Sequence, residues 1–253
     1  MVAASAAEVR YILQGIADDL REDGRRRLDF RYYSLEVGLL PQASGSSRLV
    51  SQRMDILVGV VAVLSEPDAA APHMGRITVA VSMGPGESAA SRVPVYTAGA
   101  FAVDDKRKWI EAALARLYSP QSAAKPLQEL CIVPGAHCWD LRVHVQLLQT
   151  DGCPLDAVAL AVRSALHDTC IPSVRVVDAG SDSLASNAKD KRSNAVDIEV
   201  NESMEDARHF SCGGLPLYVT LATAGGRLVA DCTAKESHAV VRERVSNTHR
   251  ARC

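Results

Sequence analysis

The sequence predicts an α+β fold in which helices pack on a mixed β-sheet. Four strand-like segments come early in the chain, strand and helix patterns then alternate, and an amphipathic helix precedes them all. The chain has 253 residues, of which 47% are hydrophobic and 23% charged, so it can form a sizeable core. Because no linker and no internal repeat interrupts the pattern, residues 1–253 are interpreted as a single domain.

The first element is predicted to be a helix over 6–21, because apolar residues recur at helical spacing and Gly24 follows. Four strands are expected next, each rich in β-branched or aliphatic residues. They cover 33–40, 47–52, 55–64 and 76–83. Ser44 to Ser46 is interpreted as the turn between the first two strands, and 66–75 as a loop.

The second half of the chain predicts helices over 103–118 and from Pro154 to about Asp168, each with an apolar stripe. Between them, 138–149 alternates apolar and polar residues with the period of a strand. Shorter elements follow: strands over 174–177 and near 196–200, a hairpin of 217–223 with 227–231, and a last helix from about Lys235. The polar stretch 180–193 is interpreted as a loop or an insertion.

Composition limits the possible partners. The formal net charge is −2, whereas a protein that binds nucleic acid alone usually has a basic excess. Aromatic residues are 4% of the chain, too few for a platform on which bases stack. Either RNA is not the partner, or the charge that binds it is local and shared with neighbouring chains.

Other classes of protein are disfavoured by specific segments. The seven cysteines show no C-x-x-C pair, which is typical of reduced thiols in an intracellular protein. The first twenty residues have no secretory apolar core, and the longest apolar run, Ile56 to Leu64, is too short to span a bilayer, so no membrane is expected. His137-Cys138 with Cys131 lacks a fourth ligand, so no metal site is predicted.

A basic cluster, Arg25 to Arg27, follows the first predicted helix. It is either a solvated helix exit or a contact with RNA or a partner, and the sequence alone leaves both interpretations open.

Several segments, in order, resemble the RNase PH-like subunits of the exosome ring. They are Tyr11 to Gly15, Asp19 to Arg25, Ser44 to Arg48, Asp55 to Val60, Cys138 to Leu148, Leu155 to Ala157, Ala161-Val162, Ala165-Leu166 and Ile171-Pro172. The resemblance runs from about Val9 to Val245, with 180–193 departing from it. It implies a fold similar to the second domain of ribosomal protein S5, a mixed sheet with packed helices.

The resemblance also implies an assembly. Six RNase PH-like chains form a ring, and RNA threads its channel toward a separate nuclease. The expected partners are other RNase PH-like ring subunits, S1/KH cap subunits, RNA bound without sequence preference, and the associated nuclease. The expected locations are the nucleus with its nucleolus and the cytoplasm, and no cofactor is expected.

Active relatives cleave RNA with phosphate, which they hold in a Gly-Thr-Arg turn after the strand equivalent to 138–149. The equivalent segment here runs from Asp151 to Asp156; Leu155 replaces the arginine, and Pro154 removes a backbone donor. Asp156 adds a negative charge. Arg142 and Arg163 are the nearest cations in sequence, and neither is expected to substitute.

The acid of active relatives is also missing, since the equivalent strand, Leu215 to Val219, has no carboxylate. Positioning and electrostatics supply most of the rate, so the sequence predicts no catalytic residue and a non-catalytic subunit that supports 3′–5′ RNA processing. Two alternatives stay open: an active phosphate-dependent exoribonuclease with a composite site, and an unrelated soluble binding protein of similar fold.

RNA contact is expected from a few cations. Arg116 is the first candidate, because its position matches an RNA-contacting arginine of archaeal relatives. Lys108 lies two helical turns earlier on roughly the same face, and a surface charge without a role fits it equally well. Arg48 and Arg25 are the weaker candidates.

Overall fold

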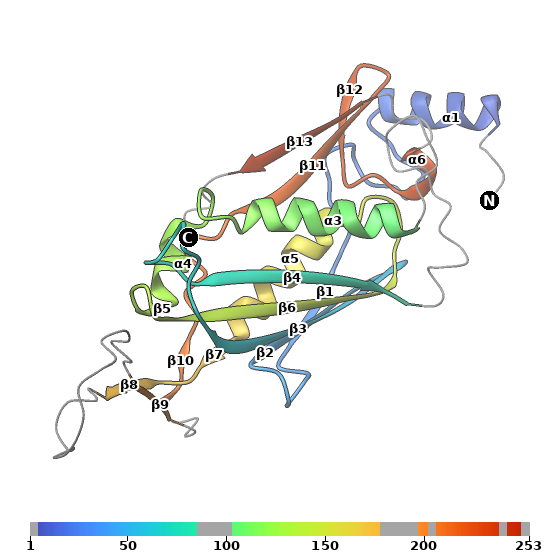
Figure 1. Ribbon diagram of the computed structural model, residues 1–253. Coiled ribbons are helices and arrows are strands. Elements are labelled where there is room, and N and C mark those ends of the chain that lie inside the picture. The colour runs from blue at the N-terminus through green and yellow to red at the C-terminus, as the bar shows by residue number, and fades with distance from the viewer. Residues whose placement is uncertain (1–4, 85–102, 178–196, 202–205, 238–241, 249–253) are drawn as a thin grey trace, which may run out of the picture.

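The fold was described from a computed structural model, which defines residues 5–84, 103–177, 197–201, 206–237 and 242–248. Its main sheet has the strand order β1-β2-β3-β6-β4, and β5 pairs with the first residues of β6 (Figure 1). The strands are β1 (Ser34–Val37), β2 (Gly45–Ser51), β3 (Met54–Ser65), β4 (Arg76–Met83), β5 (Cys131–Val133) and β6 (His137–Gln149). Only the β4–β6 pair within this sheet is parallel, so the predicted mixed sheet is confirmed.

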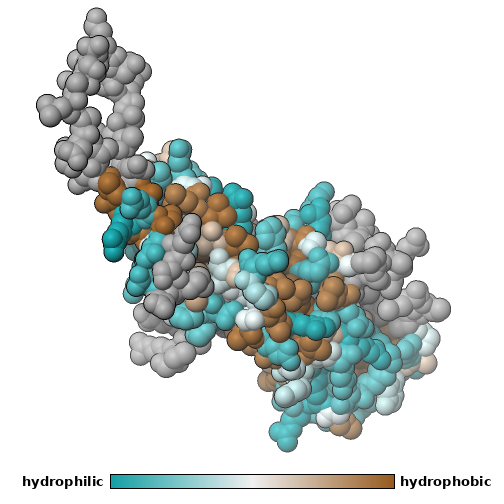
Figure 2. Space-filling view, turned by 90° about the horizontal axis from the view of Figure 1, so that it is seen from below, coloured by the Kyte–Doolittle hydropathy of each residue, from teal (hydrophilic) through white to brown (hydrophobic). Residues whose placement is uncertain are grey.

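One face of this sheet holds the main core. Alternate residues of β3 and β6, such as Val58 and Val143, point into it and are fully buried. They meet the apolar sides of α3 (Val103–Leu117), α4 (Ala124–Glu129) and α5 (Leu155–Asp168). The other face carries exposed residues such as Arg48, Arg142 and His144, as period-two alternation requires. Seen from below, apolar and polar side chains are interspersed on the surface (Figure 2).

A second, three-stranded sheet lies beyond α5, with the order β12-β11-β13. Its strands are β11 (Leu217–Ala224), β12 (Arg227–Ala230) and β13 (Arg242–Thr248). The helix α1 (Ala6–Ala17) packs on it, where Ile12 and Ile16 contact Ala222 and Val229 in a small separate core. Two short ribbons complete the fold, β7 (Cys170–Ile171) with β10 (Arg208–His209), and β8 (Val174–Val177) with β9 (Asp197–Val200).

The first helix ends at Ala17, four residues before the predicted end. Asp19 adopts a left-handed conformation with φ 58°, and the Leu20 amide donates to the Gly15 carbonyl at 2.9 Å. This is a Schellman C-cap with aspartate in place of glycine. Arg21 lies beyond this cap, and its side chain is buried.

Two other predictions were wrong. The expected helix from Lys235 is a single turn, α6 (Ala234–Ser237), and the chain then forms β13 alongside β11. The expected turn at Ser44 to Ser46 lies earlier, because Gly45 and Ser46 already pair with β3. The predicted loop at 180–193 lies outside the described residues.

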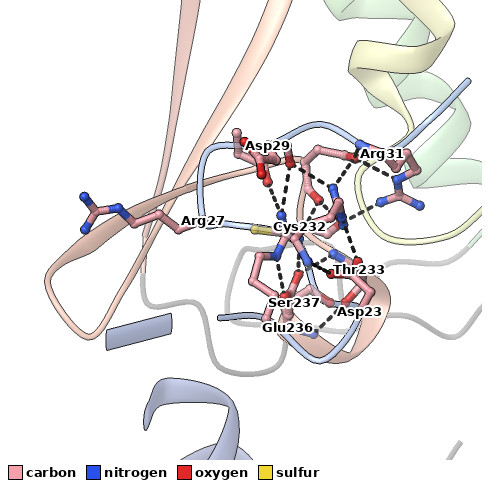
Figure 3. A network of polar contacts seen from close by, with 12 residues as sticks. Asp23, Arg27, Asp29, Arg31, Cys232, Thr233, Glu236 and Ser237 are labelled. Carbon is pink, nitrogen blue, oxygen red and sulfur yellow. Dashed lines mark hydrogen bonds and ion pairs between the residues drawn. The ribbon is translucent and has the colours of Figure 1, made fainter. Parts of the chain in front are cut away.

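A charge cluster ties the N-terminal arm, residues 21–31, to the segment after β12 (Figure 3). The Arg21 guanidinium forms two hydrogen bonds to the Glu236 carboxylate, at 2.8 and 2.5 Å, and its side chain is fully buried. It also donates to the carbonyls of Ala230 and Asp231. Arg25 and Arg31 both contact the Asp231 carboxylate, at 2.9 and 2.8 Å. The arm is therefore fixed by buried ion pairs.

We predict that Arg21→Met destabilises the protein by about 3–5 kcal/mol, because it leaves the Glu236 carboxylate buried without a cation. Lys235→Met is the matched control: its ion pair with Glu22 at 2.6 Å is about half exposed, so its loss should have little effect on the free energy of unfolding. Urea denaturation measures both free energies of unfolding. Equal losses in the two variants would show that the buried pair has no special role.

Candidate functional site

The turn between β6 and α5, residues 150–156, is the segment that the family resemblance equates with a phosphate-binding turn. In the structure, Cys153 to Val158 are all buried. Pro154 occupies the helix N-cap and provides no side-chain hydrogen bond, and Leu155 is fully buried in the main core. An anion needs free backbone N–H groups at an open helix N-terminus. Among the described residues, this N-terminus is packed inside the protein.

The Asp156 carboxylate, which the sequence interpretation takes as an added negative charge in this turn, is bound within the protein. It accepts hydrogen bonds from the Thr220 amide at 2.9 Å and the Thr220 hydroxyl at 2.6 Å, and so joins α5 to β11. Burial raises the pKa of Asp156 to about 6, although the Thr220 hydrogen bonds act in the opposite direction.

Two cations reach this turn that the sequence interpretation missed. The buried Lys106 ammonium contacts the Thr150 hydroxyl at 2.8 Å, and Arg31 contacts the Asp151 carboxylate at 3.4 Å. Lys106 lies four residues before the buried Ile110 on α3, so helical spacing could have placed it on the inward face. Arg31 is 120 residues from Asp151, and no local pattern indicates that pairing.

The two cations considered from the sequence do not reach the turn. The Arg163 guanidinium donates to the Leu215 carbonyl, and Arg142 lies on the open sheet face, 3.4 Å from the Asp140 carboxylate. Both therefore have partners elsewhere in the protein.

The segment in which the resemblance places the acid has no carboxylate between Phe210 and Thr223. Leu215 is buried in the core, and β11 begins at Leu217. The strand β13, which pairs with β11, carries Glu243 opposite Ala222, and β9 presents Glu199 to solvent. The described residues thus contain neither part of a phosphorolytic centre in its expected place.

The four candidate RNA-binding cations do not form one surface. Arg116 and Lys108 are exposed on α3, and neither side chain forms an ion pair with another described residue. Arg48 lies on the opposite face of the main sheet, where it forms two hydrogen bonds to Asp55 at 3.0 and 2.7 Å. Arg25 is bound to Asp23 and Asp231 in the charge cluster. Of the four candidates, Arg116 and Lys108 are therefore the two whose charge is available to RNA.

The described residues offer no group of three His, Cys, Asp or Glu side chains that could hold a metal ion. Their six cysteines are free thiols, and four of them are buried. No helix in the described ranges is long and apolar enough to cross a membrane.

Comparison with known proteins identifies the class to which this fold and turn belong. Residues 29–172 match the family described as the 3′ exoribonuclease family, domain 1 (RNase PH). This match covers more than half of the chain, which therefore belongs to the RNase PH family. The predicted RNase PH-like fold is confirmed.

Particular relatives are exosome components. A Pyrococcus furiosus protein named exosome complex component Rrp42 is 28% identical over 226 residues, 89% of this chain and 72% of the relative. A Dictyostelium discoideum protein, provisionally named exosome complex exonuclease RRP42, is 26% identical over 284 residues, 93% of this chain and 81% of the relative. The resemblance of Cys138 to Pro172 to ribosomal-RNA-processing protein forty-two is thus confirmed.

Solved structures agree on the fold. The Archaeoglobus fulgidus exosome with RNA bound to the active site contains a similar chain, with a TM-score of 0.63 and 21% identity. The match covers 97% of this chain and 89% of that one. An archaeal exosome core matches with a TM-score of 0.62.

We predict that the buried Asp156 makes stability depend on pH. Because its folded-state pKa is raised to about 6, its stabilising contribution is full below the unfolded pKa of about 4 and is lost as pH rises through about 6. The loss should reach up to about 3 kcal/mol. Asp156→Asn should remove this part of the decline in urea denaturation measured at pH 4 and pH 8.

Thr220→Ser is the control, since it keeps both hydrogen bonds to Asp156 and should keep the original decline. If Asp156→Asn declines as steeply as the unmodified chain, the pH dependence arises from another group.

Proposed function

We propose that the chain is a non-catalytic subunit of an RNA exosome core ring, which supports 3′–5′ RNA processing and degradation. The observation that carries the proposal is the packed N-terminus of α5. Leu155 lies in the core where active relatives need a guanidinium, and Pro154 and the buried Cys153 leave no open anion cradle among the described residues. A site without its anion cradle and its acid loses the electrostatic stabilisation on which phosphorolysis depends.

The assembly is inferred from the relatives. Proteins named Rrp42 components align with most of this chain, and the exosome that matches in fold holds RNA at its active site. We infer that this chain assembles with other RNase PH-like ring subunits, with S1/KH cap subunits above them, and with an associated nuclease that performs the cleavage. The nucleus, its nucleolus and the cytoplasm are the corresponding locations.

A second candidate function has one observation in its favour. Lys106 places a cation against Thr150 at the start of the same turn, where it is a candidate substitute for the missing arginine. The buried position of Lys106 and the packed turn argue against an active, composite phosphorolytic site.

The first test of the proposal combines assembly with activity. We expect the purified chain, incubated with single-stranded RNA and inorganic phosphate, to release no nucleoside diphosphates, and native mass spectrometry to place it in a ring with RNase PH-like partners. If nucleoside diphosphates are released and Lys106→Met abolishes their release, the result would establish the active composite site instead. A chain that stays monomeric with its candidate partners would remove the ring interpretation and favour an unrelated binding protein of similar fold.

We predict that Arg116 contributes one phosphate contact to RNA binding by the assembled ring. Each contact with single-stranded nucleic acid adds about 0.7 to the slope of log affinity against log salt concentration. Arg116→Ala should therefore lower that slope by about 0.7 and weaken binding similarly for all RNA sequences. Fluorescence anisotropy with short RNAs at several salt concentrations measures both quantities.

Lys108→Ala should act in the same direction if that lysine also faces the RNA. Arg142→Ala is the matched control, because Arg142 lies on the open sheet face beside Asp140 and is no candidate. A slope unchanged by Arg116→Ala would reject this residue as an RNA contact.

A further inference from the structure

The hairpin of β5 and β6 places two cysteines, which no part of the proposed function uses, directly opposite each other. Cys131 on β5 is the antiparallel cross-strand partner of Cys138 on β6, and the bulge of this ladder lies beyond Cys131, toward Val133. The Trp139 amide donates to the Leu130 carbonyl at 2.9 Å, so these two residues form a hydrogen-bonded pair. Because the two kinds of pair alternate along an antiparallel ladder, the adjacent cysteines form a non-hydrogen-bonded pair.

This position brings the two side chains within reach of a covalent bond. The Cα atoms of a non-hydrogen-bonded pair are about 4.5 Å apart, and the Cβ atoms of its closest members are also about 4.5 Å apart on one face of the sheet. A disulfide needs a Cα separation of about 4.4–6.8 Å and a Cβ separation of about 3.5–4.5 Å. Both thiols are free in this structure. A bond between them therefore requires side-chain rotation and little movement of the backbone.

The two thiols differ in exposure, which gives them different roles toward a reagent in solution. Cys138 is buried, whereas Cys131 is half-buried. The Cys131 sulfur lies 4.0 Å from the Pro72 carbonyl, and the Gly135 amide donates to the same carbonyl at 2.9 Å. The loop before β4 therefore lies against the hairpin, and Cys131 is the thiol of the pair that a small reagent reaches first.

The other described cysteines have no such partner. Cys170 is also half-buried, but its partner across the ribbon of β7 and β10 is His209. Cys153, Cys212 and Cys232 are buried. Among the strand pairings of the described residues, a cysteine faces a cysteine only between β5 and β6.

The pair depends on position more than on acidity. Burial raises the pKa of both thiols, although Arg76 acts in the opposite direction at Cys138. The thiolate is the reactive form, so the first attack on a reagent is slow at neutral pH. The second step is different, because a sulfur held across the ladder meets its partner at high effective concentration. We therefore expect an adduct on Cys131 to be short-lived.

We propose that Cys131 and Cys138 form a reversible disulfide that fastens β5 to β6 when low-molecular-weight disulfides such as glutathione disulfide accumulate. The Cys131 thiolate attacks one sulfur of glutathione disulfide, which releases one glutathione and leaves a mixed disulfide. The Cys138 thiolate then attacks the Cys131 sulfur and expels the second glutathione. The two protein thiols lose two protons and two electrons, and the glutathione disulfide gains them, so no other oxidant is needed.

The test uses the full chain carrying Cys170→Ser and Cys253→Ser, which removes the other half-buried thiol and the one cysteine outside the described residues. The chain is treated with glutathione disulfide, its remaining thiols are blocked, and its peptides are analysed by mass spectrometry. No lysine or arginine separates Cys131 from Cys138, so trypsin leaves both on one peptide. We expect this peptide to lose two hydrogen atoms and dithiothreitol to restore them.

The variant Cys138→Ser, added to the same chain, tests the order of the two steps. It should stop at a stable glutathione adduct on Cys131, because the second thiol is missing. A lasting adduct on Cys131 in the chain that retains both cysteines would overturn the proposal, as would two thiols that stay free. A disulfide that joins either cysteine to a different one would also overturn it. Thermal unfolding confirms that the compared chains are folded.

Hydrogen exchange tests whether the bond fastens β5. The β5 amides of the oxidised chain should exchange at least about tenfold more slowly than those of the reduced chain, because the cross-link restricts local opening of the hairpin. Cys131→Ser is the matched control, and its β5 amides should exchange equally with and without glutathione disulfide. Equal exchange in the oxidised and reduced forms of the chain with both cysteines would reject the fastening role.

Discussion

The structure depends on the buried charge cluster that holds the N-terminal arm against the C-terminal segment. Taking a guanidinium and a carboxylate out of water costs several kcal/mol per ion, so such a cluster persists only where nearly every donor and acceptor has a partner. Arg21 meets this condition with Glu236 and three backbone carbonyls. Asp231 serves both Arg25 and Arg31, and Arg31 also reaches Asp151. The same few charges therefore fix the arm that leads into β1, the segment that follows β12, and the turn that begins α5.

The same arrangement reaches the turn before α5, the segment in which the proposed function finds no anion site. Here the polar groups of the turn are satisfied from inside: Asp156 by Thr220, Asp151 by Arg31 and the Ala234 amide, and Thr150 by Lys106. Leu155 adds apolar burial in place of a charge that would need a ligand. The raised pKa of Asp156 shows the remaining cost, because burial disfavours its ionised form at neutral pH.

Local patterns in the sequence predicted the elements whose cores are continuous. The alternation of β6 and the apolar stripes of α3 and α5 gave their bounds within about two residues, and Leu155 and the missing acid of β11 were visible directly. What the sequence could not provide depends on distant partners. Arg25 and Arg27 belong to one basic cluster, yet Arg25 is bound to Asp231, 206 residues away, whereas Arg27 contacts Asp19 nearby. The strand β13 forms because β11 offers an edge, and the contact of Lys106 with Thr150 follows from packing that no short window records.

The distribution of charge bears on how such a chain could serve an RNA channel. The net charge is −2, and of the four candidate cations Arg25 and Arg48 are paired, which leaves Arg116 and Lys108 for RNA. They are eight residues apart on α3, roughly 12 Å along the helix axis. Two phosphate contacts give a salt-concentration slope of only about 1.4, which is too little for stable binding by one chain. In the proposed ring, each neighbour would add its own contacts to the same strand, and the strand held by one subunit would be presented at high effective concentration to the next. RNA binding would then be a property of the assembly, and selection on a single subunit would act on its position in the ring more than on its own net charge.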